Sequence, residues 1–219
     1  MSEFEYPPPD YLTPVRQAVL AAALPHVPFD GWSGATLTRA AADAGLSAQD
    51  LVRACPRGAI DLVEHWVAAT DQAMLAALAA TDLAVLKVRE RIALALRLRL
   101  EPLAGQKEAV RRALALQAQP PHARRALREV YRTVSAIWYA AGDTATDWNH
   151  YSKRALLAGV YSAALLYWLN DKSEGNTATW GFIDRRLDDV LKLGRVPAEL
   201  RRLAERLPNP LRVLKGRRA

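Results

Sequence analysis

An uncharged stretch at residues 155–169, ALLAGVYSAALLYWL, constrains the fold of this 219-residue chain more than any other segment. Fifteen residues are too few to cross a bilayer as a helix, which needs about 20. The stretch is also too apolar for a helix on the protein surface, which should present one polar face. It therefore predicts a helix that is buried nearly all round, either in a core or in a subunit interface.

The composition predicts an all-α protein, because apolar residues make up 51% of the chain and Ala and Leu far outnumber the strand-forming types. The single cysteine, Cys55, rules out an intrachain disulfide and fits a reducing compartment. The first residues, MSEFEYPPPDYLTP, are acidic and proline-rich, unlike a signal or transit peptide. We therefore expect a cytoplasmic protein.

Helix-capping residues and apolar periodicity divide the chain into three segments. Pro14 suits a first helical turn, Gly45 a helix C-terminus, and Ser47 with Asp50 a capping box. The ALALRLRL run at 93–100 alternates as a strand would, but its context favours a helix. Helices are expected at 14–24, 36–44, 48–54, 59–80, 83–101, 107–118, 123–141, 147–169, 178–193 and 197–207. The expected domains are a helix-turn-helix-like module at 12–58, a ligand-binding and dimerisation domain at 59–194, and a basic amphipathic tail at 195–219.

The run TLTRAAADAGLSAQDLVRAC at 36–55 resembles the helix-turn-helix of TetR-family regulators. Small residues such as Ala40 let two helices approach closely, and Gly45 supplies the positive φ of the turn. DNA binding, however, needs basic groups on the exposed recognition helix. Residues 1–57 hold four basic and six acidic side chains, a net charge of −2. We therefore expect no nucleic-acid partner, and a TetR-type transcriptional repressor remains the alternative function.

The tail at 195–219 carries eight basic and two acidic side chains, a net charge of +6. Its leucines fall along one stripe with basic residues between them, as in helices that lie on an anionic membrane surface. The alternative is a helix packed back on the body. The expected membrane-contacting residues are Leu200, Arg201, Leu203, Leu207, Leu211, Arg212, Leu214 and Lys215.

No pattern of catalytic or metal-ligating residues stands out in the sequence. The four histidines, His26, His65, His122 and His150, lack metal-ligand spacing with one another or with carboxylates. The arginines at 53 and 57 could lower the pKa of Cys55, but no general base lies near it, which favours a structural thiol. We expect a protein without catalytic residues, metal or cofactor.

Three longer runs carry a more specific resemblance: PHVPFDGWSGATL at 25–37, AIWYAAGDTATDWNHYSKRALLAGVY at 136–161, and YWLNDKSEGNTATWGFIDRRLDDV at 167–190. They resemble the coenzyme Q biosynthesis protein nine family over about residues 12–194. The resemblance implies a TetR-like fold without repressor function, a homodimer and a bound isoprenoid lipid. It also implies delivery of quinone precursors to the di-iron demethoxyubiquinone hydroxylase. A bacterial member would lie peripherally on the inner membrane.

The residues themselves offer support for a lipid site and a dimer. The helices expected at 83–101, 123–141 and 147–169 carry more large apolar side chains than a small bundle needs. An ordinary core explains any one of these residues better, and a lined cavity is the more specific interpretation of the whole set. An isoprenoid quinone precursor or a phospholipid would fit it. Ala155, Ala158, Gly159 and Ala163 suit a close dimer contact. The candidate lipid-binding residues are Leu96, Leu100, Val134, Trp138, Tyr161 and Leu165.

The run TDWNHYSKR combines rigid aromatic residues with charges at the start of a helix. Tyr, Trp and Arg are the residue types that contribute most to protein interfaces, although a helix start with a solvated charge pair explains the run equally well. The resemblance implies that the hydroxylase docks here, and His150 stands where the family pattern has an aromatic residue. The candidate partner-binding residues are Asp147, Trp148, His150, Tyr151 and Arg154.

Overall fold

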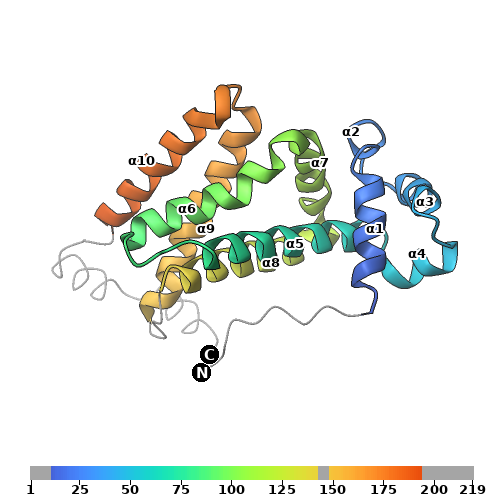
Figure 1. Cartoon of the computed structure of the whole chain (residues 1–219), viewed down its shortest axis with the longest axis horizontal. Helices are drawn as coiled ribbons and strands as arrows, with labels where there is room; N and C mark the ends of the chain where they lie inside the picture. The colour runs from blue at the N-terminus through green and yellow to red at the C-terminus, as the bar shows by residue number, and fades with distance from the viewer. Residues whose placement is uncertain (1–10, 143–147, 194–219) are drawn as a thin grey trace, which may run out of the picture.

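The computed structural model describes the backbone of residues 11–142 and 148–193, and the side chains of residues 11–142 and 152–190. Every regular element in these ranges is helical, so the all-α prediction is confirmed (Figure 1). The elements are α1 (Thr13–Ala23), α2 (Val27–Asp30), α3 (Gly34–Asp43), α4 (Ala48–Ala54), α5 (Ala59–Ala79), α6 (Val88–Leu100), the 3-10 helix η1 (Glu101–Gln106), α7 (Lys107–Gln117), α8 (Pro120–Ala140), α9 (Trp148–Asn170), the 3-10 helix η2 (Glu174–Asn176) and α10 (Thr177–Leu193).

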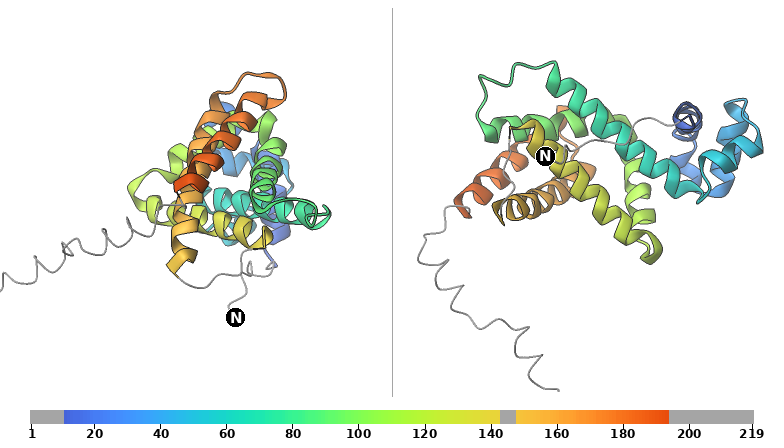
Figure 2. Two further views of the ribbon diagram at one scale, coloured as in Figure 1. Left: turned by 90° about the vertical axis from the view of Figure 1, so that its left-hand side faces the viewer. Right: turned by 90° about the horizontal axis from the view of Figure 1, so that it is seen from below.

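Helices α1 to α4 form a small module at one end of the molecule (Figures 1 and 2). The predicted capping box is present: the Ser47 side chain accepts from the backbone of Asp50, and the Asp50 carboxylate accepts from the backbone of Ser47. Gly45 has φ of 68°, the left-handed conformation that the turn requires. The short helix α2 was not predicted. The indole of Trp32, which follows α2, donates to the carbonyl of Ala109 at 3.0 Å and ties the module to α7.

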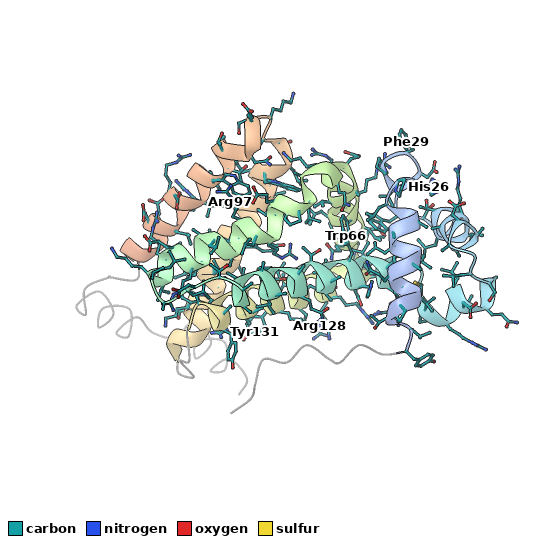
Figure 3. The ribbon with its side chains drawn as sticks, in the orientation of Figure 1. His26, Phe29, Trp66, Arg97, Arg128 and Tyr131 are labelled. Atoms are coloured by element: carbon teal, nitrogen blue, oxygen red, sulfur yellow. The ribbon has the colours of Figure 1, made fainter. Side chains whose placement is uncertain are left out.

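The larger domain is a bundle in which the long helices α5 and α8 lie side by side, with α6 and α9 packed against them and α10 covering α6 and α9 (Figure 1). Figure 3 shows Trp66 of α5 at the junction with α1, and Tyr131 of α8 projecting away from the body. The α6 segment is helical despite its alternating sequence. Its buried positions, Ile92, Ala95, Leu96, Arg99 and Leu100, follow the helical period.

Helix α9 corrects the expectation of burial all round. Leu157, Ala164 and Trp168 are buried, but Leu166 is 59% exposed and Tyr167 is 39% exposed. In the single chain, this uncharged helix therefore has one buried face and one open face. The sequence also predicts that this stretch could lie in a subunit interface. Such an interface requires an uncharged open face of this kind.

The turn between α9 and α10 explains the polar run that follows the apolar stretch. The Asp171 carboxylate accepts hydrogen bonds from the backbone and hydroxyl of both Ser173 and Thr179. The ammonium of Lys107 donates to the Asp171 carbonyl at 2.6 Å and lies 5.0 Å from the centre of the Trp168 ring. These contacts fix the start of α10 relative to α7 and α9.

Candidate functional site

A cavity of about 420 Å³ lies within the larger domain. Helices α5, α7, α8 and α9 supply most of its lining, and Arg99 of α6 and Leu103 of η1 complete it. Apolar side chains dominate, among them Trp66, Val110 and Leu165. A concave, mostly apolar site with a few polar groups is the common form of a small-molecule pocket.

The cavity opens to solvent at a rim formed by α8 and α9. Leu127 of α8 is 74% exposed and Leu166 of α9 is 59% exposed, and both line the cavity. Ala118, Ala123 and Ser162 are further lining residues that are exposed. The rim is therefore uncharged, and an elongated apolar molecule could extend through it.

The structure brings two of the six candidate lipid-binding residues to the cavity and places the other four in the core. Tyr161 and Leu165 do line it. Leu96, Leu100, Val134 and Trp138 instead pack in the core, where the first three are completely buried. Apolar periodicity identifies the inward face of a helix, but it does not distinguish side chains that fill the core from those that border a void.

The sequence analysis did not predict that α5 and α7 line the cavity. Their lining residues include Val67, Ala113 and Leu114, and Ala118 follows directly after α7. The signal that could have found them is the small side chains at facing positions, because Ala113 on α7 and Ala126 on α8 leave space that larger residues would fill.

One wall of the cavity is polar and rests on a buried ion pair. The Arg99 guanidinium donates to an Asp71 oxygen at 2.6 Å, and the Thr133 hydroxyl donates to the other Asp71 oxygen at 2.7 Å. Arg99 also lies 5.1 Å from the centre of the Tyr161 ring. Arg99 and Asp71 are almost fully buried, so the charge of Arg99 is compensated inside the protein.

The second polar element of this wall is the contact between Gln117 and Glu129. The Gln117 amide donates to one Glu129 oxygen at 2.5 Å, and both side chains are buried. Burial raises the pKa of Glu129 to about 7, and the nearby Glu64 carboxylate adds to the effect. Glu129 is thus a carboxyl group that changes protonation near neutral pH while it borders an apolar cavity.

Comparison with known proteins assigns the family. A COQ9 family model matches residues 123–194. The Ubiquinone biosynthesis protein COQ9, mitochondrial, of Drosophila melanogaster is 34% identical over 184 residues, covering 82% of this chain and 56% of the fly protein. The protein of the same name from Rattus norvegicus is 28% identical over 225 residues, covering 94% of this chain and 72% of the rat protein. The chain belongs to the COQ9 family.

The chain thus spans little more than half of the fly COQ9 protein. Among solved structures, a TetR transcriptional regulator from Nitrosomonas europaea ATCC 19718 is similar with a TM-score of 0.67 and 24% identity, covering 80% of this chain and 97% of the regulator. This likeness confirms the TetR-like fold and bears on the fold alone.

The expected docking cluster of this COQ9-family chain is only partly described. Asp147 lies outside the described residues, as do the side chains of Trp148, His150 and Tyr151. Arg154 is 5% exposed and donates to the Ser135 hydroxyl at 3.1 Å. The expectation of a partner-contacting Arg154 is therefore corrected, because a buried guanidinium held between α9 and α8 positions the helix instead.

The expected membrane-contacting residues, from Leu200 to Lys215, lie outside the described residues. Within residues 11–142 and 148–193, no helix is both long enough and apolar enough to cross a membrane. Among the described side chains, those of residues 11–142 and 152–190, no group of three His, Cys, Asp or Glu residues is arranged to bind a metal ion.

Cys55 behaves as a structural thiol. Burial raises its pKa to about 11, and the Asp61 carboxylate adds to the effect. The Arg57 guanidinium, which could have lowered the pKa, instead contacts Asp61 and Glu64.

Two of the histidines make side-chain hydrogen bonds. The Nε2 atom of His26 lies 2.7 Å from Oδ2 of Asp43, and the Nε2 atom of His65 lies 3.2 Å from Oε1 of Gln17.

Replacing Glu129 by Gln should flatten the pH dependence of stability. Because the pKa of Glu129 is raised in the folded chain, the unfolded chain loses its proton first as pH rises from 5 to 7. Folding stability therefore declines in this window, by up to about 1.4 kcal/mol per pH unit. Glu129→Gln keeps an acceptor for Gln117 and removes this decline.

Urea unfolding of both proteins at pH 5, 6, 7 and 8 measures the effect. The other charged groups near Glu129, namely Glu64 and Asp71 of α5, Arg99 of α6 and Arg132 of α8, are unchanged in the variant. The exposed Glu101→Gln serves as the control and should follow the parent protein. Parallel curves of unfolding free energy against pH for the parent and Glu129→Gln would contradict the raised pKa of Glu129.

Proposed function

We propose that this protein is a non-enzymatic lipid-binding accessory protein of ubiquinone biosynthesis. It holds a polyprenyl quinone precursor and presents it to the di-iron demethoxyubiquinone hydroxylase. The observation that carries the proposal is the apolar cavity of about 420 Å³ in a chain of the COQ9 family. The names of the fly and rat relatives support the pathway.

The cavity suits a lipid for a simple energetic reason. Each methylene group that leaves water for an apolar lining contributes about 0.8 kcal/mol. An isoprenoid segment beside Trp66 and Leu165 would gain this stabilisation, and the rest of a long tail would leave at Leu127 and Leu166. The uncharged rim imposes no charge barrier on such a tail.

The repressor alternative shares the fold, so charges must decide between the two functions. Of the arginines in the helix-turn-helix-like module, Arg16 donates to the Ala54 carbonyl at 2.8 Å and Arg57 binds two carboxylates. Val52 is 66% exposed on the helix that would read DNA. Few cations are thus left for phosphate contacts, which supply most non-specific affinity for DNA.

A homodimer is proposed through the part of the open face of α9 that precedes the cavity rim. Ala155, Leu156 and Gly159 lie exposed there, and a Cβ added at Gly159 would meet no atom within 4 Å. A second copy could therefore approach this helix closely. We also propose that residues 195–219 bind an anionic membrane surface, which vesicle flotation with and without residues 196–219 tests.

Filling the cavity should abolish lipid binding without unfolding the protein. Ala113→Trp places a large ring in the space between α7 and α8, and a lining with spare volume accepts it for about 1–3 kcal/mol. Ala115→Trp, on the exposed face of the same helix, is the matched control. Binding of a fluorescent fatty-alcohol probe should disappear only in Ala113→Trp. Retained probe binding in a folded Ala113→Trp protein would contradict a ligand at this cavity.

Two substitutions in the first turns of α9 should separate docking from positioning. Tyr151→Ala should weaken binding to the hydroxylase about 30-fold, as loss of an aromatic interface residue commonly does, with an unchanged melting temperature. Arg154→Ala should lower the melting temperature, because it removes the buried bond to Ser135. Affinity by surface plasmon resonance and thermal melting measure the two effects. Unchanged hydroxylase affinity in Tyr151→Ala would argue against docking at this position.

A further inference from the structure

The outward face of α8 carries a row of large side chains that the rest of the described chain leaves exposed. Arg124, Leu127, Arg128 and Tyr131 have the spacing that places residues on one helix face, and we call them the α8 strip. Leu127 is 74% exposed, Tyr131 is 45% exposed, and both arginines are exposed. Figure 3 shows Arg128 and Tyr131 projecting away from the body. Arginine and tyrosine are enriched at protein interfaces, so this row is a candidate contact surface.

The positive charge of the strip is not compensated by the described part of the chain. Among the described side chains, no carboxylate forms an ion pair with Arg124 or Arg128, whereas the neighbouring Arg125 lies 3.5 Å from Glu64 of α5. The one acidic residue of α8 is Glu129, and it is buried on the inward face. The strip therefore favours a partner that is acidic and also carries apolar or aromatic groups.

The first ten residues of the chain, MSEFEYPPPD, have this composition. Three of their side chains are acidic and none is basic, and Phe4 and Tyr6 supply two aromatic rings. The prolines at 7–9 favour a polyproline backbone, which advances about 3.1 Å per residue. In charge and in apolar character, this segment is complementary to the α8 strip.

The point of attachment brings the segment within reach of the strip. It joins the described chain at Tyr11, next to α1, and α5 packs against both α1 and α8. In Figure 1 the start of α1 and α8 lie on the lower side of the molecule, and both are visible from below in Figure 2. Neighbouring helix axes lie about 8–10 Å apart, so the path across α5 takes about 20 Å. Seven residues of polyproline chain cover about 22 Å, which is enough to bring Phe4 to the strip.

We propose that residues 3–10 dock on the α8 strip of their own chain and act as a removable cover for it. The carboxylates of the segment pair with the two arginines, and its rings pack on Leu127 and Tyr131. Exposed ion pairs are weak individually, but attachment within one chain supplies an effective concentration in the millimolar range. Because Leu127 also borders the cavity rim, the docked segment covers part of that rim. The inference does not depend on what the cavity holds.

Paramagnetic relaxation enhancement detects the docked segment in the full chain. A nitroxide is attached at Ser2→Cys, and the native Cys55 is buried and stays unlabelled. We expect the amide signals of residues 124–131 to lose most of their intensity at low salt. The loss should be about three-fold smaller in sodium chloride at about 1 M, where the Debye length is about 3 Å. The amides of α10, on the upper side in Figure 1, should keep their intensity.

Reversing the charge of the strip should release the segment. Arg124→Glu with Arg128→Glu should reduce the relaxation loss about five-fold, since two exposed ion pairs together are worth roughly that factor. Adding Glu3→Arg and Glu5→Arg to this variant should restore the loss, because the pairs form again with their signs exchanged. Restoration separates a specific contact from a general effect of net charge.

A matched control changes the net charge by the same amount elsewhere. Arg39→Glu in α3 with Arg185→Glu in α10 replaces two exposed arginines away from the strip and should keep the full relaxation loss. All four substituted arginines are exposed, so thermal melting should show that both double variants stay folded.

Further outcomes would overturn the inference. No loss of signal at residues 124–131, or a loss that persists after charge reversal of the strip, excludes docking through these arginines. A mixture of spin-labelled chains with isotope-labelled chains tests the origin of the contact. An equal loss in this mixture would mean that the strip binds the segment of a second copy. Signals of α8 that change only when phosphatidylglycerol vesicles are added would assign the strip to a membrane surface instead.

Discussion

The buried ion pair between Arg99 and Asp71 is the interaction on which the larger domain depends. It joins α6 to α5, the Thr133 hydroxyl adds α8, and the Tyr161 ring against the guanidinium adds α9. An arginine on the buried face of α6 is tolerated only because both Asp71 oxygens are satisfied. Removal of one partner from such a pair typically costs about 3–5 kcal/mol, so the pair fixes the relative positions of four helices.

This pair also gives the cavity its chemical character. Because Arg99 is neutralised within the protein, the polar wall presents hydrogen-bonding groups rather than a free positive charge. Gln117 and Glu129 extend that wall, and small side chains such as Ala113 and Ala126 keep the remaining volume open. The result is a TetR-like domain with an apolar cavity whose buried charge is compensated by the protein itself. The module at the other end retains a helix-turn-helix shape, but intramolecular contacts occupy much of its positive charge.

Local sequence signals predicted the helices well and the site less well. The capping box at Ser47 and the glycine at 45 mark their turns correctly, because capping depends on residues within one turn of each other. The apolar run of α9 indicates a helix, but its sequence does not reveal that Leu166 lies on an open face. That outcome depends on which helices pack against α9, and those contacts involve residues distant in the chain.

The cavity residues illustrate the same limit. Tyr161 and Leu165 were identified because they share the inward face of α9, whereas Leu96 and Val134 satisfy the same pattern and fill the core. A void is a property of how several helices fit together, and periodicity along one helix does not encode it. Arg154 shows the converse, since a charged residue in a polar run proves to be buried through its bond to Ser135.

Native mass spectrometry of the protein purified without detergent tests the central claim most directly, namely that the apolar cavity holds a polyprenyl quinone precursor. The account predicts one bound molecule per chain, with the mass of such a precursor. A chain that carries no lipid when isolated from cells that make ubiquinone, or one that carries only anionic phospholipid, would contradict it.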